Sequence, residues 1–85
     1  MNPNHADVYS FLGALYLSNN DIEKAIKQFK LAIDNNPNLI KVYGFISLAY
    51  AMQGDFEKAD KFLLQAKLKG YKNYEMIENK IELLR

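Results

Sequence analysis

The sequence predicts an all-α fold, an α-solenoid of two antiparallel helical hairpins that a fifth helix caps. A repeat of 34 residues is the first observation: Asn-Pro-Asn-x-x-x-Val-Tyr occurs at residues 2–9 and again at residues 36–43. Aligned without a gap, residues 2–35 and 36–69 are identical at 13 of 34 positions. A fixed period of this length is typical of stacked repeats, in which one unit cannot bury its apolar face alone.

Helical spacing of the apolar residues is the second observation. Tyr9, Leu12 and Tyr16 lie at i, i+3 and i+7, and similar spacing continues through residues 22–33. This period indicates amphipathic helices, and no strand-like alternation competes with it. The pattern predicts five helices, over about residues 6–19, 21–35, 39–53, 55–70 and 74–85.

Polar residues and glycine mark the ends of these helices. Asn4, Asp21, Asp55 and Asn73 precede the first, second, fourth and fifth helices. There a side-chain oxygen can accept a hydrogen bond from a free backbone N–H group. Gly54 suits the left-handed turn between the third and fourth helices.

The repeat divides the chain into three parts. We expect one domain over residues 1–85, with repeat one at about 6–39, repeat two at about 40–73 and a capping helix at about 74–85. This length is enough for one small core.

Composition narrows the classes of function. Eleven basic and ten acidic residues give a formal net charge of +1, so no excess of charge predicts binding to nucleic acid or to an anionic membrane. Cysteine is absent, which excludes disulfides and thiolate metal sites. No apolar stretch approaches the ~20 residues that span a bilayer, and no secretory signal is recognisable. We therefore expect a cytoplasmic protein.

Catalytic residues are lacking as well. His5 is the single histidine, and no Cys, Ser or paired carboxylate lies at a spacing that would make it a catalytic base. No metal motif, phosphate-binding Gly-rich loop or nucleophile elbow is present. The sequence thus predicts no enzyme, no cofactor and no metal site.

Residues at fixed places in the two units resemble those of a known family. In the first unit these residues are Tyr9, Leu12, Gly13, Tyr16, Ala25, Phe29, Ala32 and Pro37. In the second unit they are Tyr43, Ile46, Ser47, Tyr50, Ala59, Leu63 and Ala66, with Tyr71 in place of the closing proline. The chain is in this respect similar to tetratricopeptide repeat (TPR) proteins. The resemblance implies stacked helical hairpins that bind another protein without catalysis.

By the same resemblance, the first helix of each hairpin lines a concave face that holds the candidate binding residues. The centre of this face is small and apolar, which suits an apolar anchor from a peptide or helix of the partner. Glutamates at one end favour a basic flank on that partner. The candidate residues are Asp7, Ser10, Ala14, Leu17, Lys41, Phe45, Leu48, Met52, Glu78 and Glu82.

Alternatives to this interpretation remain open. Leu17 and Leu48 could pack between neighbouring first helices and leave little open surface. The unit could instead form homo-oligomers through the outer face of its first hairpin, for which Phe11 and Leu15 are candidates. It could also be the docking arm of a larger enzyme.

A residue near each end of the chain indicates how far the repeat extends. Pro3 lies 34 residues before Pro37, at the closing position of a preceding unit, so we expect that the chain derives from a longer array. A proline that starts a helix is the alternative.

Ile81 falls where a complete repeat has a small residue and would overfill a helix crossing. We therefore expect a capping helix with an apolar stripe of Ile77, Ile81 and Leu84 and an outer side of Glu75, Glu78, Lys80 and Glu82.

Overall fold

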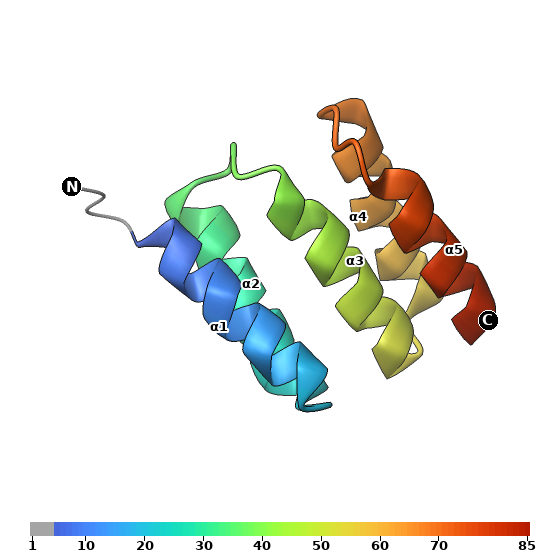
Figure 1. The fold of residues 1–85 in the computed structure, drawn as a ribbon, viewed down its shortest axis with the longest axis horizontal. Coiled ribbons are helices and arrows are strands. Elements are labelled where there is room, and N and C mark those ends of the chain that lie inside the picture. The colour runs from blue at the N-terminus through green and yellow to red at the C-terminus, as the bar shows by residue number, and fades with distance from the viewer. Residues whose placement is uncertain (1–4) are drawn as a thin grey trace.

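A computed structural model describes residues 5–85, which form five helices and no strand. The helices are α1 (Ala6–Ser18), α2 (Ile22–Asn35), α3 (Lys41–Gln53), α4 (Phe56–Leu68) and α5 (Tyr74–Leu84) (Figure 1). The predicted all-α fold is confirmed for this part of the chain. In it, no helix has the length and apolar character needed to cross a membrane. The expected cap at Asn4 and the closing position at Pro3 lie outside the described residues.

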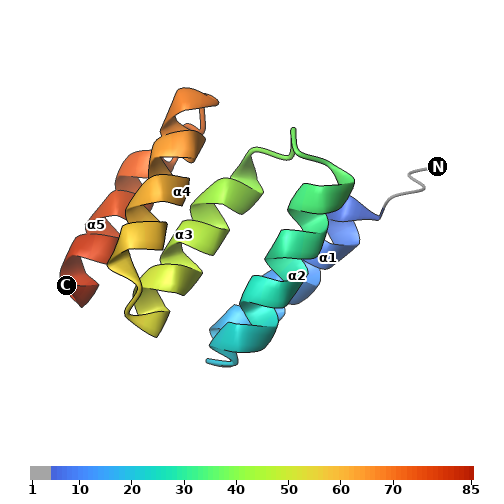
Figure 2. The ribbon, with the colours of Figure 1, turned by 180° about the vertical axis from the view of Figure 1, so that it is seen from behind.

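The helices form two layers. α1, α3 and α5 lie side by side in one layer, and α2 and α4 lie in the other, as two opposite views show (Figures 1 and 2). α1 packs on α2 and α3 packs on α4, and α2 joins the two hairpins because it also packs against α3. α1 and α3 share few contacts. The helices therefore pair as TPR-like hairpins, and α1, α3 and α5 together present one face of the molecule.

The turns within the two hairpins share one backbone conformation. Asn20 has φ 65° and Gly54 has φ 93°, both in the left-handed region. In each hairpin the N–H group of the following aspartate donates to the carbonyl of a tyrosine five residues earlier, at 2.8 and 2.9 Å. These bonds satisfy carbonyl groups that a helix end leaves free. The predicted left-handed turn at Gly54 is confirmed, and Asn20 adopts the same conformation in the first hairpin.

The predicted helix caps are only partly correct. The carboxylate of Asp55 accepts a hydrogen bond from the Lys58 N–H group at 3.2 Å. Asp21 and Asn73 occupy the equivalent positions before α2 and α5, but their side chains make no cap hydrogen bond. The exposed Asp21 carboxylate stays in solvent. Asn73, with ψ 17°, lacks the extended backbone that directs a capping side chain towards the helix.

Two helix ends differ from their predicted places. α3 begins at Lys41 rather than Leu39 because a turn intervenes, in which the side-chain oxygen of Asn36 accepts a hydrogen bond from the Asn38 N–H group at 3.1 Å. α4 ends at Leu68, before the left-handed turn at Gly70 (φ 89°). Local turn hydrogen bonds of this kind compete with helix formation at helix ends.

Phe29 of α2 is at the centre of the core. Its side chain is fully buried, and its ring lies 5.9 Å from the ring of Phe45 of α3. A Cβ atom added to Gly13 of α1 would lie 2.5 Å from the Phe29 ring. Gly13 is therefore small because α1 and α2 approach closely where they cross, as the sequence predicted.

α5 covers the far side of the second hairpin. Ile77 and Ile81 are buried in the core, whereas Leu84, at the end of the helix, is largely exposed; it does not belong to the predicted apolar stripe. Tyr71, which stands in place of a proline, packs so closely on Gly44 that an added Cβ there would lie 2.6 Å from its ring. Of the two helices of the preceding hairpin, α5 shares more contacts with the first, α3, whereas α3 shares more contacts with the second, α2. α5 thus does not repeat the placement of α3.

Candidate functional site

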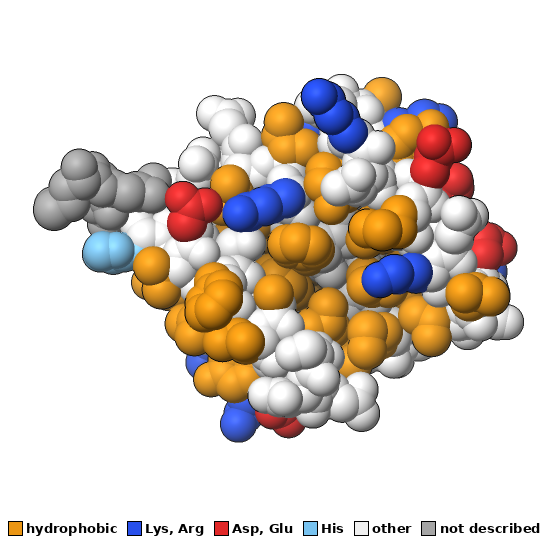
Figure 3. Space-filling view, viewed as in Figure 1, with side chains coloured by type: hydrophobic (Ala, Val, Ile, Leu, Met, Phe, Trp, Pro, Cys, Tyr) orange, Lys and Arg blue, Asp and Glu red, His pale blue; other side chains and the backbone are white. Residues whose placement is uncertain are grey.

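A groove of about 330 Å³ runs across α1, α3 and α5. Space-filling atoms on this face show apolar side chains gathered over all three helices, with a basic side chain among them (Figure 3). Volumes of ~300–1,000 Å³ and a largely apolar lining are typical of ligand pockets. The groove is lined by Ala14, Leu17, Ser18, Phe45, Leu48, Met52, Met76, Ile77 and Lys80.

Helical spacing brings the lining residues to one side of each helix. Ala14 and Leu17 are three residues apart on α1, and Phe45, Leu48 and Met52 lie at i, i+3 and i+7 on α3. Such residues share one face of a helix. The structure thus brings together five of the predicted residues.

The side chains that line the groove differ in how deeply they are buried. Leu17, Phe45 and Leu48 are half-buried and pack against the core, so they form its floor. The alternative in which Leu17 and Leu48 close the surface is therefore only partly met, since both still line an open hollow. Met52 of α3 and Met76 of α5 are 36 and 49 % exposed. Methionine is flexible and polarisable, and it adapts to irregular apolar partners.

Ser10 does not belong to this surface, although the sequence placed it there. The residue is 2 % exposed. Ser10 lies three residues before Gly13 and four after Ala6, and all three face the interior of the hairpin. The contact of Gly13 with Phe29 sets this rotation of α1. A buried serine offers no surface to a partner.

Asp7 and Lys41 lie at the starts of α1 and α3, outside the groove lining. Both side chains are largely exposed, and the Lys41 Nζ atom is 4.0 Å from the carboxylate of Asp7. An exposed pair at this distance contributes ~0–1 kcal/mol. The two charges offset each other at the edge of the face.

Glu78 and Glu82 point away from the groove, towards α4. Glu78 lines a separate hollow of about 220 Å³ with residues of α4. Glu82 accepts a hydrogen bond from Arg85, which also pairs with Asp60 of α4. These bonds, first to Asp60 and then to Glu82, raise the pKa of Arg85 above its ordinary value. The acidic end that the sequence predicted for the groove is therefore absent from its lining.

The rotation of α5 explains this difference. Burial of Ile77 and Ile81 directs Met76 and Lys80 towards the groove. Met76 was not among the predicted residues, and the predicted place of Lys80 on the outer side of α5 is wrong. If α5 had the register of α3, Glu78 and Glu82 would take the places of Gly44 and Leu48, 34 residues earlier. The i, i+4 spacing of Met76 and Lys80 was the available signal.

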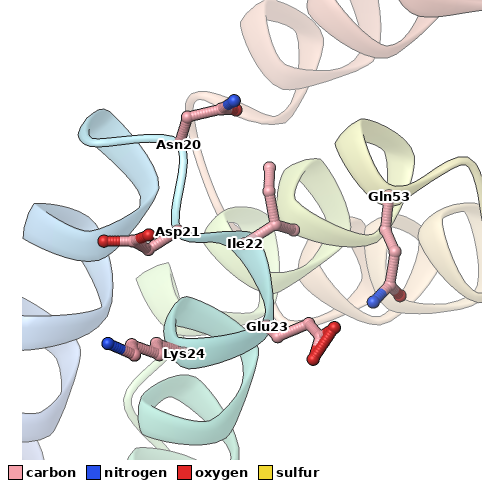
Figure 4. A pocket seen from close by; sticks show the side chains of 6 residues that line it. All are labelled: Asn20, Asp21, Ile22, Glu23, Lys24 and Gln53. Atoms are coloured by element: carbon pink, nitrogen blue, oxygen red, sulfur yellow. The ribbon is translucent and has the colours of Figure 1, made fainter.

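A larger hollow of about 470 Å³ lies at the turn between α1 and α2 (Figure 4). Asp21 and Lys24 point to one side of it and Glu23 to the other (Figure 4). Charged groups that point in different directions cannot contact the same small ligand. Across residues 5–85, no group of three or more potential metal ligands occurs. His5 is exposed before α1.

Comparison with known proteins accounts for the repeat. Models of the tetratricopeptide repeat match residues 6–39 and residues 40–67. Searches of curated proteins and of solved structures found no match to the chain. Tetratricopeptide repeats generally mediate interactions between proteins. The repeated sequence, the stacked hairpins and the two matches show that this chain belongs to the tetratricopeptide repeat family.

Proposed function

We propose that the chain is a non-catalytic module whose groove over α1, α3 and α5 binds a segment of a partner protein. The observation that supports this most is that three helices, far apart in sequence, contribute apolar side chains to one open hollow. Open apolar surface of this kind marks interaction sites on monomers. The volume suits one or two anchoring side chains.

The charged residue in the groove indicates which residue should flank the apolar anchor of the partner segment. Lys80 is the one charged residue of the lining. Among the described residues its ammonium group has no ion-pair partner within 4.0 Å. A carboxylate next to the apolar anchor would pair with it at the edge of the groove. The segment we propose therefore carries a bulky apolar residue followed or preceded by Asp or Glu, rather than the basic flank expected from the sequence.

Peptides selected from a random display library against the protein test this proposal. We expect selected peptides to carry the apolar and acidic pair, and Leu48→Glu to weaken their binding by at least about tenfold, because it places a charge on the groove floor. Met52→Glu gives the same test at a more exposed position, in case Leu48→Glu fails to fold. Leu68→Glu, on the exposed side of α4, is the matched control.

The outcomes separate the two parts of the proposal. Binding that Leu48→Glu and Met52→Glu leave unchanged contradicts the groove itself. Binding that these variants abolish but Lys80→Ala leaves unchanged contradicts only the acidic flank. Fluorescence anisotropy measures both, and circular dichroism confirms that each variant retains its helices.

A further inference from the structure

A second apolar surface lies on α1, beside the groove but outside its lining. Val8, Phe11 and Leu15 are spaced at i, i+3 and i+7, and their side chains are 52, 63 and 45 % exposed. We call these three residues the α1 stripe. Large apolar side chains that share one exposed helix face are more informative than apolar residues scattered singly.

The equivalent positions of the second repeat are mostly covered. Val42, Phe45 and Ala49 follow the stripe residues by 34 positions. Val42 and Ala49 are fully buried. Phe45 is half-buried: its ring lies 5.9 Å from that of Phe29 of α2, and it also lines the groove. Helix α2 thus covers on α3 the surface that no helix of residues 5–85 covers on α1. In the second repeat, the equivalent side of α3 is thus a surface that packs against a helix.

The exposed side of α4 is a poor match for this surface. Phe56 and Asp60 of α4 hold the places of Ile22 and Ile26 in α2. Arg85 lies 5.1 Å from the centre of the Phe56 ring and pairs with Asp60. End-to-end stacking of one copy on the α4 side of the next would therefore have to break these contacts and bury charges, which is costly.

The α1 stripe of a second copy is a better partner for this surface than the exposed side of α4. Asp7 is the one charged residue of α1, so the exposed face of this helix is apolar and nearly uncharged. We propose that the α1 stripe packs against the α1 stripe of a second copy of this chain, which gives a dimer with twofold symmetry. Such an interface uses the same patch on both subunits and closes on itself.

An antiparallel arrangement makes the stripe self-complementary. Phe11 then packs on Phe11 of the second copy, and Val8 packs on its Leu15. Asp7 then lies beside Leu15 and Tyr16, near the opposite end of the second α1, so the two Asp7 carboxylates stay apart. In a parallel arrangement these like charges would face each other, at a cost in affinity.

Sedimentation equilibrium from micromolar to near-millimolar concentration tests the dimer. We expect a concentration-dependent monomer–dimer equilibrium, and Phe11→Glu should raise its dissociation constant by at least about tenfold. Because Phe11 is mostly exposed, this change leaves the fold intact, which circular dichroism checks. Leu68→Glu, at an even more exposed leucine of α4, is the control and should leave the equilibrium unchanged.

A covalent probe tests the geometry. The chain has no cysteine, so Phe11→Cys introduces a single thiol, which should form a disulfide-linked dimer under mild oxidation far faster than Leu68→Cys does. A monomer at all concentrations overturns the proposal, as does a dimer that Phe11→Glu leaves intact. A dimer that Met52→Glu disrupts equally also overturns it, because the stripe would then occupy the groove of the second copy.

Discussion

The first helices of the two repeats, α1 and α3, have related sequences and different surroundings. Val8 of α1 is half exposed, whereas Val42, the same residue 34 positions later, is fully buried. The cause is α2, which packs against α3 on the side that remains open on α1. A repeat sequence therefore sets the shape of a helix and the positions of its apolar residues, while the neighbouring helix decides which of them become core.

The same comparison separates two kinds of apolar surface. The groove runs over α1, α3 and α5, and two pairs of equivalent positions line it: Ala14 with Leu48, and Ser18 with Met52. The α1 stripe is exposed because no helix of residues 5–85 covers α1 as α2 covers α3. The following substitutions compare equivalent positions, from the largest expected effect to the smallest.

Phe29→Ala should have the largest effect, because Phe29 of α2 contacts both α1 and α3. Removing a fully buried aromatic ring costs ~3–5 kcal/mol of unfolding free energy. Urea denaturation followed by circular dichroism measures it. A loss below ~1 kcal/mol would mean that the ring does not hold the two hairpins together.

Val42→Ala and Val8→Ala make the same substitution at equivalent positions of α3 and α1. Val42→Ala should lower the unfolding free energy by about 2 kcal/mol, from lost burial and a new cavity. Val8→Ala should change it by less than ~0.5 kcal/mol in the monomer. Both values come from the same denaturation experiment at low protein concentration. Equal losses would contradict the different burial of the two valines.

Asp55→Ala and Asp21→Ala compare the turns of the two hairpins. Asp55 accepts a cap hydrogen bond and Asp21 does not, so Asp55→Ala should lower the unfolding free energy by ~1 kcal/mol. Asp21→Ala should cost clearly less. Thermal unfolding of both variants decides between them, and a larger loss for Asp21→Ala would reverse the assignment of the caps.

Much of the fold could be predicted from the sequence because the same pattern of large and small residues occurs in both repeats. Gly13 and Phe29 appear at the right places for a close helix crossing, and the structure has them in contact. Helix ends were less accurate, since the turn at Asn36 depends on side-chain hydrogen bonds that compete with the helix. Periodicity alone contains no information on that competition.

The groove could be predicted only in part. Residues of α1 and α3 repeat a known register, and Ala14, Leu17 and Leu48, which it proposes for the concave face, line the groove. α5 has no second helix to pair with in residues 5–85, and Ile77 and Ile81 instead set its rotation through their burial. This rotation is a property of the packed core, and the repeat pattern does not include it.

Methyl NMR of methionine tests the central claim, that the groove is the binding surface. The chain has three methionines, and two of them, Met52 and Met76, line the groove from α3 and α5. With ¹³C-methyl methionine, titration with a selected peptide should shift both of these signals, and half of the full shift should be reached when the free peptide concentration equals its dissociation constant. A peptide that binds while the Met52 and Met76 signals stay unchanged would contradict the account.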